Sequence, residues 1–442
     1  MKILDVAHGW VKGFLAENVD LLWRSGLALF FRVIGAASSF ILGVVLARKL
    51  GAAESGVFFI VFNMLVLASA AFRCGFDDVL LRLLSVSFSA ERWVESKATF
   101  IFSICFVLFF SAAGAFLIFL GSDFLANEFY SKPDLAPVIE IMVWSSIGLS
   151  GLTLCAVALQ SAGRVVSSVL TLNVFSNITS AILIHIYADD VFDAAIIYVL
   201  STFGSFLFGL ASFYFPIFKL GGGIGGRDFR GAATSILPGA MRLWPVLILS
   251  QFLLLVGQFF TGVFASEVEA AYYAAAQRSA MLVSFVLMAV NLIVAPRFAQ
   301  LYGEKNYEAV QKLAKSSIVI VLFFAMPASA LMFFMPSFFI SLFGTAFVAG
   351  VDVLRILVVG QLINVAFGPM FYILLMSGGE RESRRVVMVV FPLSIIFGYV
   401  FTVSYGVNGA AFSSLLIFII QGILTVQAVN KKYGRRMIGF RI

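Results

Sequence analysis

Residues 21–47 read LLWRSGLALFFRVIGAASSFILGVVLA, an apolar run interrupted by two charges, Arg24 and Arg32. A helix needs about 20 apolar residues to cross the hydrocarbon core of a bilayer. The residues before this run lack the short apolar core and small-residue cleavage site of a signal peptide. The run is therefore expected to remain in the protein as a membrane-spanning helix.

Eleven further apolar runs follow along the chain, at 57–84, 98–120, 138–160, 165–187, 194–218, 236–264, 270–300, 314–335, 350–376, 386–404 and 408–429. They are continuously apolar and lack the alternation of barrel strands, so helices are expected. Of all 442 residues 61% are hydrophobic and 12% are charged, about half the charged share of a soluble protein. The sequence predicts an all-α polytopic membrane protein with twelve transmembrane helices.

The distribution of Lys and Arg predicts the orientation in the membrane. The N-terminal stretch, the even-numbered loops and the tail together carry 23 of these residues, whereas the opposite side carries only Arg48, Lys49 and Lys132. Positive loops stay in the cytoplasm, so both termini are expected there. The split also accounts for the net charge of +7, and no nucleic-acid partner is expected.

The chain resembles itself at an offset of 215 to 216 residues. Glu54 after the first span corresponds to Glu269 after the seventh, and Ser161 and Asp193 correspond to Ser377 and Asn408 at later span boundaries. Three matches in order favour a duplication. Because six spans return the chain to its starting side, the repeats are expected to be parallel six-helix lobes around a central cavity.

The predicted domains follow from this duplication. They are an N-terminal lobe at 1–218, a cytoplasmic Gly-rich linker at 219–235, a C-terminal lobe at 236–429 and a basic cytoplasmic tail at 430–442. The linker glycines satisfy a dinucleotide fingerprint only by spacing, since no strand precedes them. No cofactor is expected.

Four arginines fall inside predicted spans: Arg32, Arg242, Arg278 and Arg355. A charge at the bilayer centre costs about 3 kcal/mol or more, so such residues usually face the bundle interior or a wet cavity. Arg32 and Arg278 have no acid within four residues and are the best candidates for a cationic cavity. Arg242 is close enough to the cytoplasmic end to reach the interface, and Arg355 follows Asp352 by three residues, so structural interpretations remain open for both.

The embedded acids are Asp77, Asp78, Glu140 and Asp352, all near span ends. They are the candidates for a gate or for coupling to H⁺ or Na⁺, although an ion-pair cluster with Arg73 and Arg82 is favoured for the first two. Amides inside spans, among them Asn63 and Gln258, could line a path for sugar hydroxyls, with interhelical hydrogen bonds as the favoured interpretation. No catalytic constellation, paired-His metal site or long loop is present, so a transporter is expected instead of an enzyme.

One stretch resembles a known family. Residues 46–58 read LARKLGAAESGVF and precede Arg73, Cys74, Gly75 and Phe76, then Leu80, Leu81 and Arg82. This pattern resembles the opening of Wzx-type polysaccharide flippases of the multidrug/oligosaccharidyl-lipid/polysaccharide exporter superfamily, and the span plan and basic tail extend the likeness over nearly the whole chain.

The resemblance implies a flippase of the bacterial inner membrane that moves an undecaprenyl-diphosphate-linked oligosaccharide from the cytoplasmic to the periplasmic leaflet by alternating access. Surface polysaccharides such as the O-antigen of lipopolysaccharide are built this way, with membrane lipids and other polysaccharide-assembly proteins as implied partners. The embedded arginines are the candidates for a cationic lumen, on their position alone.

Three alternatives remain open. A multidrug antiporter of the same superfamily would be expected to carry unpaired embedded carboxylates. A peptidoglycan-precursor flippase usually has more than twelve spans. A membrane polysaccharide polymerase would be expected to have a large periplasmic loop. The sequence leaves the glycan, the coupling ion and the oligomeric state undetermined.

Overall fold

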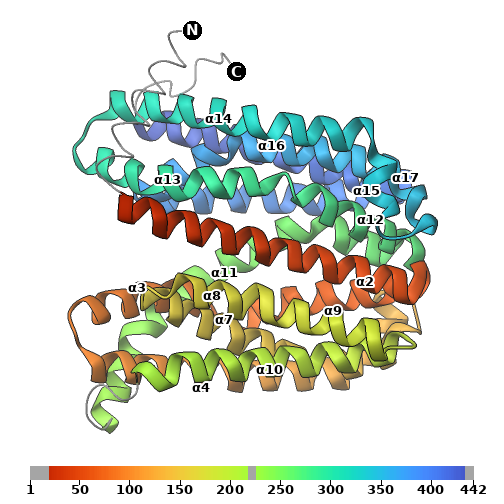
Figure 1. Ribbon diagram of the computed structural model, residues 1–442, viewed down its shortest axis with the longest axis horizontal. Helices are drawn as coiled ribbons and strands as arrows, with labels where there is room; N and C mark the ends of the chain where they lie inside the picture. The colour runs from red at the N-terminus through yellow and green to blue at the C-terminus, as the bar shows by residue number, and fades with distance from the viewer. Residues whose placement is uncertain (1–18, 218–224, 434–442) are drawn as a thin grey trace.

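The computed structural model describes residues 19–217 and 225–433, and this part of the chain is helical with no strand. The long helices run side by side, and the chain turns gather at the two ends of the bundle (Figure 1). One end contains Gly51, Lys132, Ser266 and Gly406. We call it the outer end, because the charge distribution predicts that it faces the periplasm.

Helices of the N-terminal half pack at the bottom of Figure 1. They are α2 (Val19–Phe72), α3 (Phe76–Ser89), α4 (Trp93–Leu120), α5 (Ser122–Phe124), η1 (Leu125–Phe129), α6 (Leu135–Met142), α7 (Ser145–Ser161), α8 (Val165–Val169), η2 (Leu170–Phe175), α9 (Ser176–Tyr187) and α10 (Val191–Ile217).

Most helices of the C-terminal half pack at the top, while α11 begins in the lower group, and α2 lies along the boundary between the two groups. They are α11 (Gly226–Phe264), α12 (Glu267–Met281), α13 (Ser284–Gly303), α14 (Tyr307–Phe334), α15 (Pro336–Ser341), η3 (Thr345–Gly350), α16 (Val351–Met376) and α17 (Glu380–Tyr433).

Within the described residues, each predicted apolar run lies on one helix or on two or three consecutive helical segments, the run at 165–187 being divided among α8, η2 and α9. The run at 57–84 is interrupted by a turn at Arg73–Gly75 between α2 and α3, and the run at 270–300 is divided between α12 and α13. By length and composition, eight of the described helices could cross a membrane, or nine if α6 and α7, bent by 41°, form one span. The division into twelve spans in two lobes stays a prediction.

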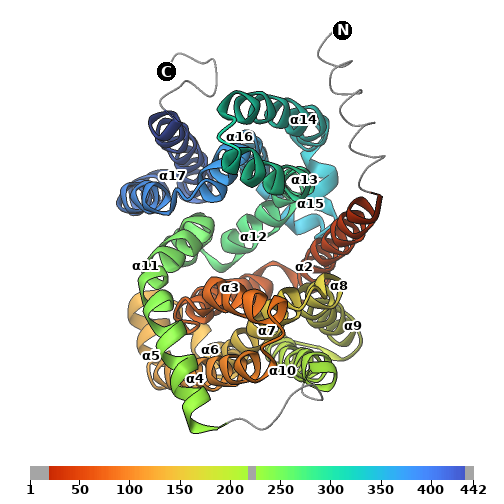
Figure 2. The same cartoon turned by 90° about the vertical axis from the view of Figure 1, so that its left-hand side faces the viewer.

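Two of the eight helices are too long for a single span. At about 1.5 Å per residue, the 54 residues of α2 and of α17 would each exceed twice the hydrocarbon thickness of a bilayer. Each is broken by a glycine with positive φ, Gly51 at 74° and Gly406 at 59°. Figure 2 shows α17 as two separate rods. Both glycines lie where the sequence predicts a turn between spans.

Helix α11 connects the two groups. Its first half packs on the N-terminal helices, since Ile236 and Ala240 belong to the same buried cluster as Phe76. Its second half packs on α17 through Leu253 and Phe260. Figure 2 shows α11 running from the lower group to the upper one.

The predicted linker overlaps the start of α11. Residues 219–224 lie outside the described residues, but residues 226–235 are the first turns of α11. The helix begins there because the Asp228 carboxylate accepts a hydrogen bond of 2.8 Å from the Gly225 N–H. The lobe boundaries at 218 and 236 stay predictions.

The two groups meet most closely where α2 crosses α12. Helix α12 presents small side chains to the crossing, and its Ala270, Ala271 and Ala275 are fully buried. On α2, Gly56 lies directly against the backbone of Glu267 at the start of α12. Small residues let helix backbones approach in this way, and the resulting dispersion contacts hold membrane helices together.

We expect Gly56→Ala to destabilise the protein, because the added Cβ would overlap the Glu267 carbonyl oxygen. Overpacking of this kind typically costs about 1–3 kcal/mol. Gly204→Ala is the matched control, since a Cβ there meets nothing within 4 Å. In thermal unfolding of the purified protein, the first variant should melt several degrees below wild type and the second should not. Equal melting temperatures would contradict the close crossing.

Candidate functional site

Arg278 lies on α12 at the interface of the two helix groups. Its guanidinium carbon is 4.0 Å from the ring centre of Phe59 and 5.5 Å from that of Phe62, both on the second half of α2. On the first half of α2, Gly43 leaves the space for its stem, since a Cβ there would lie 2.7 Å from Arg278 Cδ. Arg278 is thus enclosed by both halves of α2.

Aromatic rings fix the position of this guanidinium. Tyr198 on α10 packs edge-on against Phe62 at 5.6 Å and against Phe58 at 5.7 Å. The face of Phe59 attracts the cation through its quadrupole, an interaction of about 0.5–2 kcal/mol. No carboxylate among the described residues forms an ion pair with Arg278. Its N–H donors therefore remain available to an anion.

Arg32 lies on the same face of α2 as Gly43. The two residues are eleven positions apart, close to three full turns, and the Arg32 side chain is half-buried. Arg32 has no ion pair among the residues that the structure describes. Arg32 therefore lies about 16 Å along α2 from Gly43, the residue that contacts Arg278, as measured by helical rise.

Arg242 and Arg355 lie elsewhere. Arg242 is exposed on α11, on the face opposite Ala240, which packs on the N-terminal helices. Arg355 is exposed near the outer end of α16, where it donates to the Asp352 carboxylate at 3.0 Å and to the Phe333 carbonyl at 3.4 Å. The guanidinium of Arg355 therefore has its hydrogen-bond partners within its own helix group.

Three of the four candidate acids have local partners. Asp77 pairs with Arg73 at 2.8 Å, and Asp352 pairs with Arg355. Glu140 accepts a hydrogen bond of 3.2 Å from the Ser122 hydroxyl. Asp78 is exposed at the start of α3. The structure does not bring these acids together, and no cluster of metal ligands occurs among the described residues.

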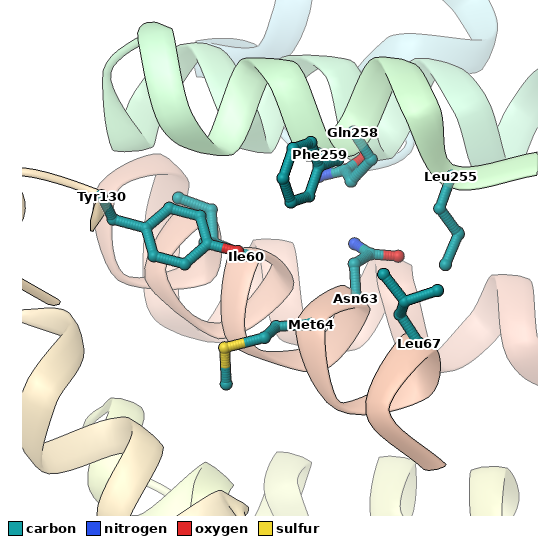
Figure 3. A pocket seen from close by; sticks show the side chains of 8 residues that line it. All are labelled: Ile60, Asn63, Met64, Leu67, Tyr130, Leu255, Gln258 and Phe259. Atoms are coloured by element: carbon teal, nitrogen blue, oxygen red, sulfur yellow. The ribbon is translucent and has the colours of Figure 1, made fainter. Parts of the chain in front are cut away.

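A second polar site lies between α2 and α11 (Figure 3). Asn63 and Gln258 face one another across a small pocket, and Tyr130 lies at one end of it. The remaining wall is apolar, formed by Ile60, Met64, Leu67, Leu255 and Phe259. The sequence marked both amides, and the structure places them together.

Lys132 joins the two groups at the outer end. It lies in the turn between η1 and α6, and its ammonium donates to the Gly262 carbonyl of α11 at 2.9 Å and to the Tyr130 carbonyl at 3.3 Å. Burial lowers the pKa of Lys132, while the carboxylates of Glu267 and Glu269 act in the opposite direction. The side chain is only 9% exposed, and its two hydrogen bonds link the turn between η1 and α6 to α11.

Sequence reasoning missed several of these residues. Lys132 was counted only as a loop charge, because its partner is a backbone carbonyl 130 positions away. Phe59, Phe62 and Tyr198 belong to continuous apolar runs, where no periodicity distinguishes them from packing residues. Glu54 could have been found from the sequence, because it corresponds to Glu269 in the internal repeat. Its buried carboxylate oxygen Oε2 has no hydrogen-bond partner among the described residues.

Comparisons with known proteins agree on the fold. Residues 243–400, well under half of the chain, match the MatE family model. No curated protein matches the chain.

Solved structures match over nearly the full length. An inward-facing multidrug resistance MATE family transporter of the MOP superfamily superposes with a TM-score of 0.74 at 16% identity, covering 93% of this chain and 98% of that one. The lipid II flippase MurJ, in an inward closed conformation, gives 0.72 at 15% identity, covering 92% and 87%. A MOP superfamily transporter from Pyrococcus furiosus, for which reverse polarity of the binding pocket suggests a different function, gives 0.68 at 18%, covering 95% and 98%. The chain therefore has the fold of MATE-like transporters.

We expect Lys132→Met to loosen the outer end, because the variant keeps the apolar stem but loses the donor to Gly262. Lys49→Met is the control, since Lys49 is exposed and near the same end. In a cysteine-free background carrying Asn63→Cys, a membrane-impermeant thiol reagent added outside should label the Lys132→Met protein several-fold faster than the control. Equal rates would show that Lys132 does not keep the outer end closed.

Proposed function

We propose that this protein is an alternating-access transporter of the bacterial inner membrane that moves an undecaprenyl-diphosphate-linked oligosaccharide from the cytoplasmic to the periplasmic leaflet, for surface polysaccharide synthesis. The fold supports the transporter class, because both the MATE transporters and MurJ superpose over most of the chain. The likeness to MurJ, a lipid II flippase, supports a lipid-linked cargo.

The observation that carries the proposal is the unpaired guanidinium of Arg278 at the interface of the two groups. Arg278 is half-buried, and a cation withdrawn from water without a carboxylate partner is costly. Charged residues inside a membrane bundle commonly mark substrate pathways. A guanidinium donates two parallel hydrogen bonds to phosphate oxygens and keeps its charge in a low-dielectric site. A diphosphate linker matches this chemistry.

Transport then follows from exchanging contacts between the two helix groups. Arg278 binds the diphosphate while the outer end is closed by Lys132 and by the α2–α12 crossing. Arg32, further along the same strip of α2, gives the anion an earlier contact on its way in. The polyprenyl tail stays in the bilayer, since moving it through a polar interior would lose its apolar contacts with lipid.

The runner-up function is a cation-coupled multidrug antiporter, favoured by the MatE match and by the MATE structures. Charge at the interface distinguishes the two functions. A cationic drug calls for an unpaired carboxylate in the cavity. Asp77 and Asp352 are paired with arginines, and Glu54, which has an oxygen unpartnered within the described part of the chain, lies beside the Gly51 turn at the outer end of α2. Arg278, by contrast, is a cation at the helix-group interface with no ion pair among the described residues. The Pyrococcus furiosus transporter supports this use of charge, since its reversed pocket polarity suggests a different function within one fold.

Coupling to H⁺ or Na⁺ is proposed at an acid, with Asp77, Asp78, Glu140 and Asp352 as the candidates from sequence. Glu54 joins them, because its Oε2 atom is buried and unpartnered within the described part of the chain. Other polysaccharide-assembly proteins and membrane lipids are proposed partners, and both termini are proposed to be cytoplasmic.

We expect Arg278→Gln to reduce translocation at least tenfold without preventing membrane insertion, because it removes the charge that binds the diphosphate. Arg355→Gln is the matched control, since Arg355 is exposed and paired locally. The measurement is leaflet accessibility of the lipid-linked repeat unit to a periplasm-restricted sugar-modifying probe, in cells relying on each variant. Normal translocation in the depleted strain would instead favour the antiporter, which drug-efflux assays would then test.

A further inference from the structure

Three cations, Arg48, Lys49 and Lys132, lie at the outer end, where positive charge is otherwise avoided. The inner side carries 23 Lys and Arg residues, as expected where positive loops stay in the cytoplasm. In the structure Arg48 and Lys132 each donate a hydrogen bond to a backbone carbonyl of the C-terminal group, whereas Lys49 is exposed. Two of the three exceptions to the charge rule thus have a structural partner across the boundary between the helix groups.

The hydrogen bond of Lys132 reaches the last turn of α11. Its ammonium donates to the Gly262 carbonyl at 2.9 Å, and α11 ends at Phe264. The last four carbonyls of a helix have no partner within that helix. The N–H of Ser266, four residues after Gly262, donates instead to the Glu269 carboxylate at 2.9 Å. Lys132 therefore supplies a cap that α11 does not provide for itself.

Arg48 has the same role at the end of α15. Its Nε atom donates to the Leu342 carbonyl at 2.7 Å, and Leu342 is the first residue after α15. The next residue, Phe343, holds this turn against α2, since it is fully buried and its ring centre lies 5.3 Å from that of Phe40. The carbonyl that Arg48 binds therefore has a fixed position beside α2.

The two hydrogen bonds lie on either side of the α2–α12 crossing at Gly56. Arg48 precedes Gly56 by eight residues on α2. Gly262, which accepts from Lys132, packs against Ile60, four residues after Gly56. The bonded residues are 294 and 130 positions apart in the chain. The outer end is therefore held at three points, the crossing and one cation on each side of it.

The two hydrogen bonds differ in their exposure to water. Arg48 is exposed, so water competes for the Leu342 carbonyl and for the guanidinium. The Lys132 side chain is only 9% exposed, so its bond to Gly262 is shielded. A shielded bond to a charged donor contributes more than an exposed one. Loss of Lys132 should therefore affect the outer end more than loss of Arg48.

We propose that Arg48 and Lys132 form a latch that holds the transporter closed to the outside by capping the ends of α15 and α11 across the boundary between the groups. Separation of the groups at the outer end breaks both hydrogen bonds and removes a partner from each helix end. The latch rests on the alternating-access part of the proposed function and not on the cargo. It applies to a flippase and to an antiporter alike.

The latch is tested with two cysteine reporters in right-side-out membrane vesicles, with a membrane-impermeant maleimide added outside. The first reporter is Asn63→Cys in a cysteine-free background. Asn63 lies between the helix groups in one pocket with Tyr130, whose carbonyl also accepts from Lys132 (Figure 3). The second reporter is native Cys155 as the only cysteine, which is buried among the N-terminal helices. Opening of the outer end exposes the first reporter, whereas a general loosening of the fold exposes both.

Arg48→Met should speed labelling of the first reporter about threefold, as loss of one exposed contact between a cation and a helix end would give. Lys132→Met should speed it more, and the double variant should show the product of the two effects, because independent contacts add in free energy. Lys49→Met is the matched control and should label like wild type. Lys132→Arg, which keeps a charged donor, should also stay near wild type. Labelling of Cys155 should be equal in all variants.

Three outcomes would overturn the latch. They are an unchanged rate in Arg48→Met, a double variant that labels no faster than Lys132→Met, and a parallel acceleration at Cys155. The first two would show that Arg48 does not hold the outer end, and the third that the substitutions loosen the whole fold. None of them bears on the cargo, which leaflet accessibility in Arg278→Gln measures separately.

Discussion

The crossing of α2 and α12 is the contact on which the rest of the arrangement depends. In a bilayer the lipid tails are as apolar as the helices, so burial of apolar surface gives little reason for two helix groups to associate. Close backbone approach supplies the attraction instead, and here it requires Gly56 on one side and an alanine-rich face on the other. Arg278 lies about three turns beyond Glu267 on α12, so the same contact fixes where the cation meets Phe59.

A second constraint is the cost of charge in hydrocarbon. The protein resolves it differently at each embedded arginine. Arg355 has an acid three residues away and a carbonyl beside it, which is a structural solution complete in itself. Arg278 has aromatic faces and no acid among the described residues. The first arrangement would be weakened by a competing anion, while the second would be completed by one.

The sequence was sufficient to locate the helices, because the length of an apolar run is a local property. It also singled out Arg32 and Arg278 from the lack of a nearby acid, and their role stays a prediction. Its twelve apolar runs lie on single helices or on broken sets of helical segments, and composition alone did not reveal the breaks at Arg73–Gly75 and between α12 and α13. Contacts between segments far apart in the chain could not be predicted from the sequence. Nothing near Lys132 indicates that its ammonium reaches the Gly262 carbonyl, and nothing near Gly43 indicates that Arg278 packs against it.

The proposed duplication relates Arg278 to Asn63 and Gly43 to Gln258, each at an offset of 215 residues, and the two pairs differ in polarity. If the two pairs were identical, each would place an arginine at the same interface, and two unpaired cations there would repel one another in a low-dielectric setting. Replacing one by Asn63 removes that repulsion and leaves a neutral position at the equivalent place. Gln258, in turn, stands at the position that corresponds to Gly43, and Gly43 makes room for the stem of Arg278. The members of the first pair depend on one another, because a side chain larger than glycine at position 43 would overlap the Arg278 stem. In the second pair Asn63 is shorter than an arginine, and it lines a pocket together with Gln258.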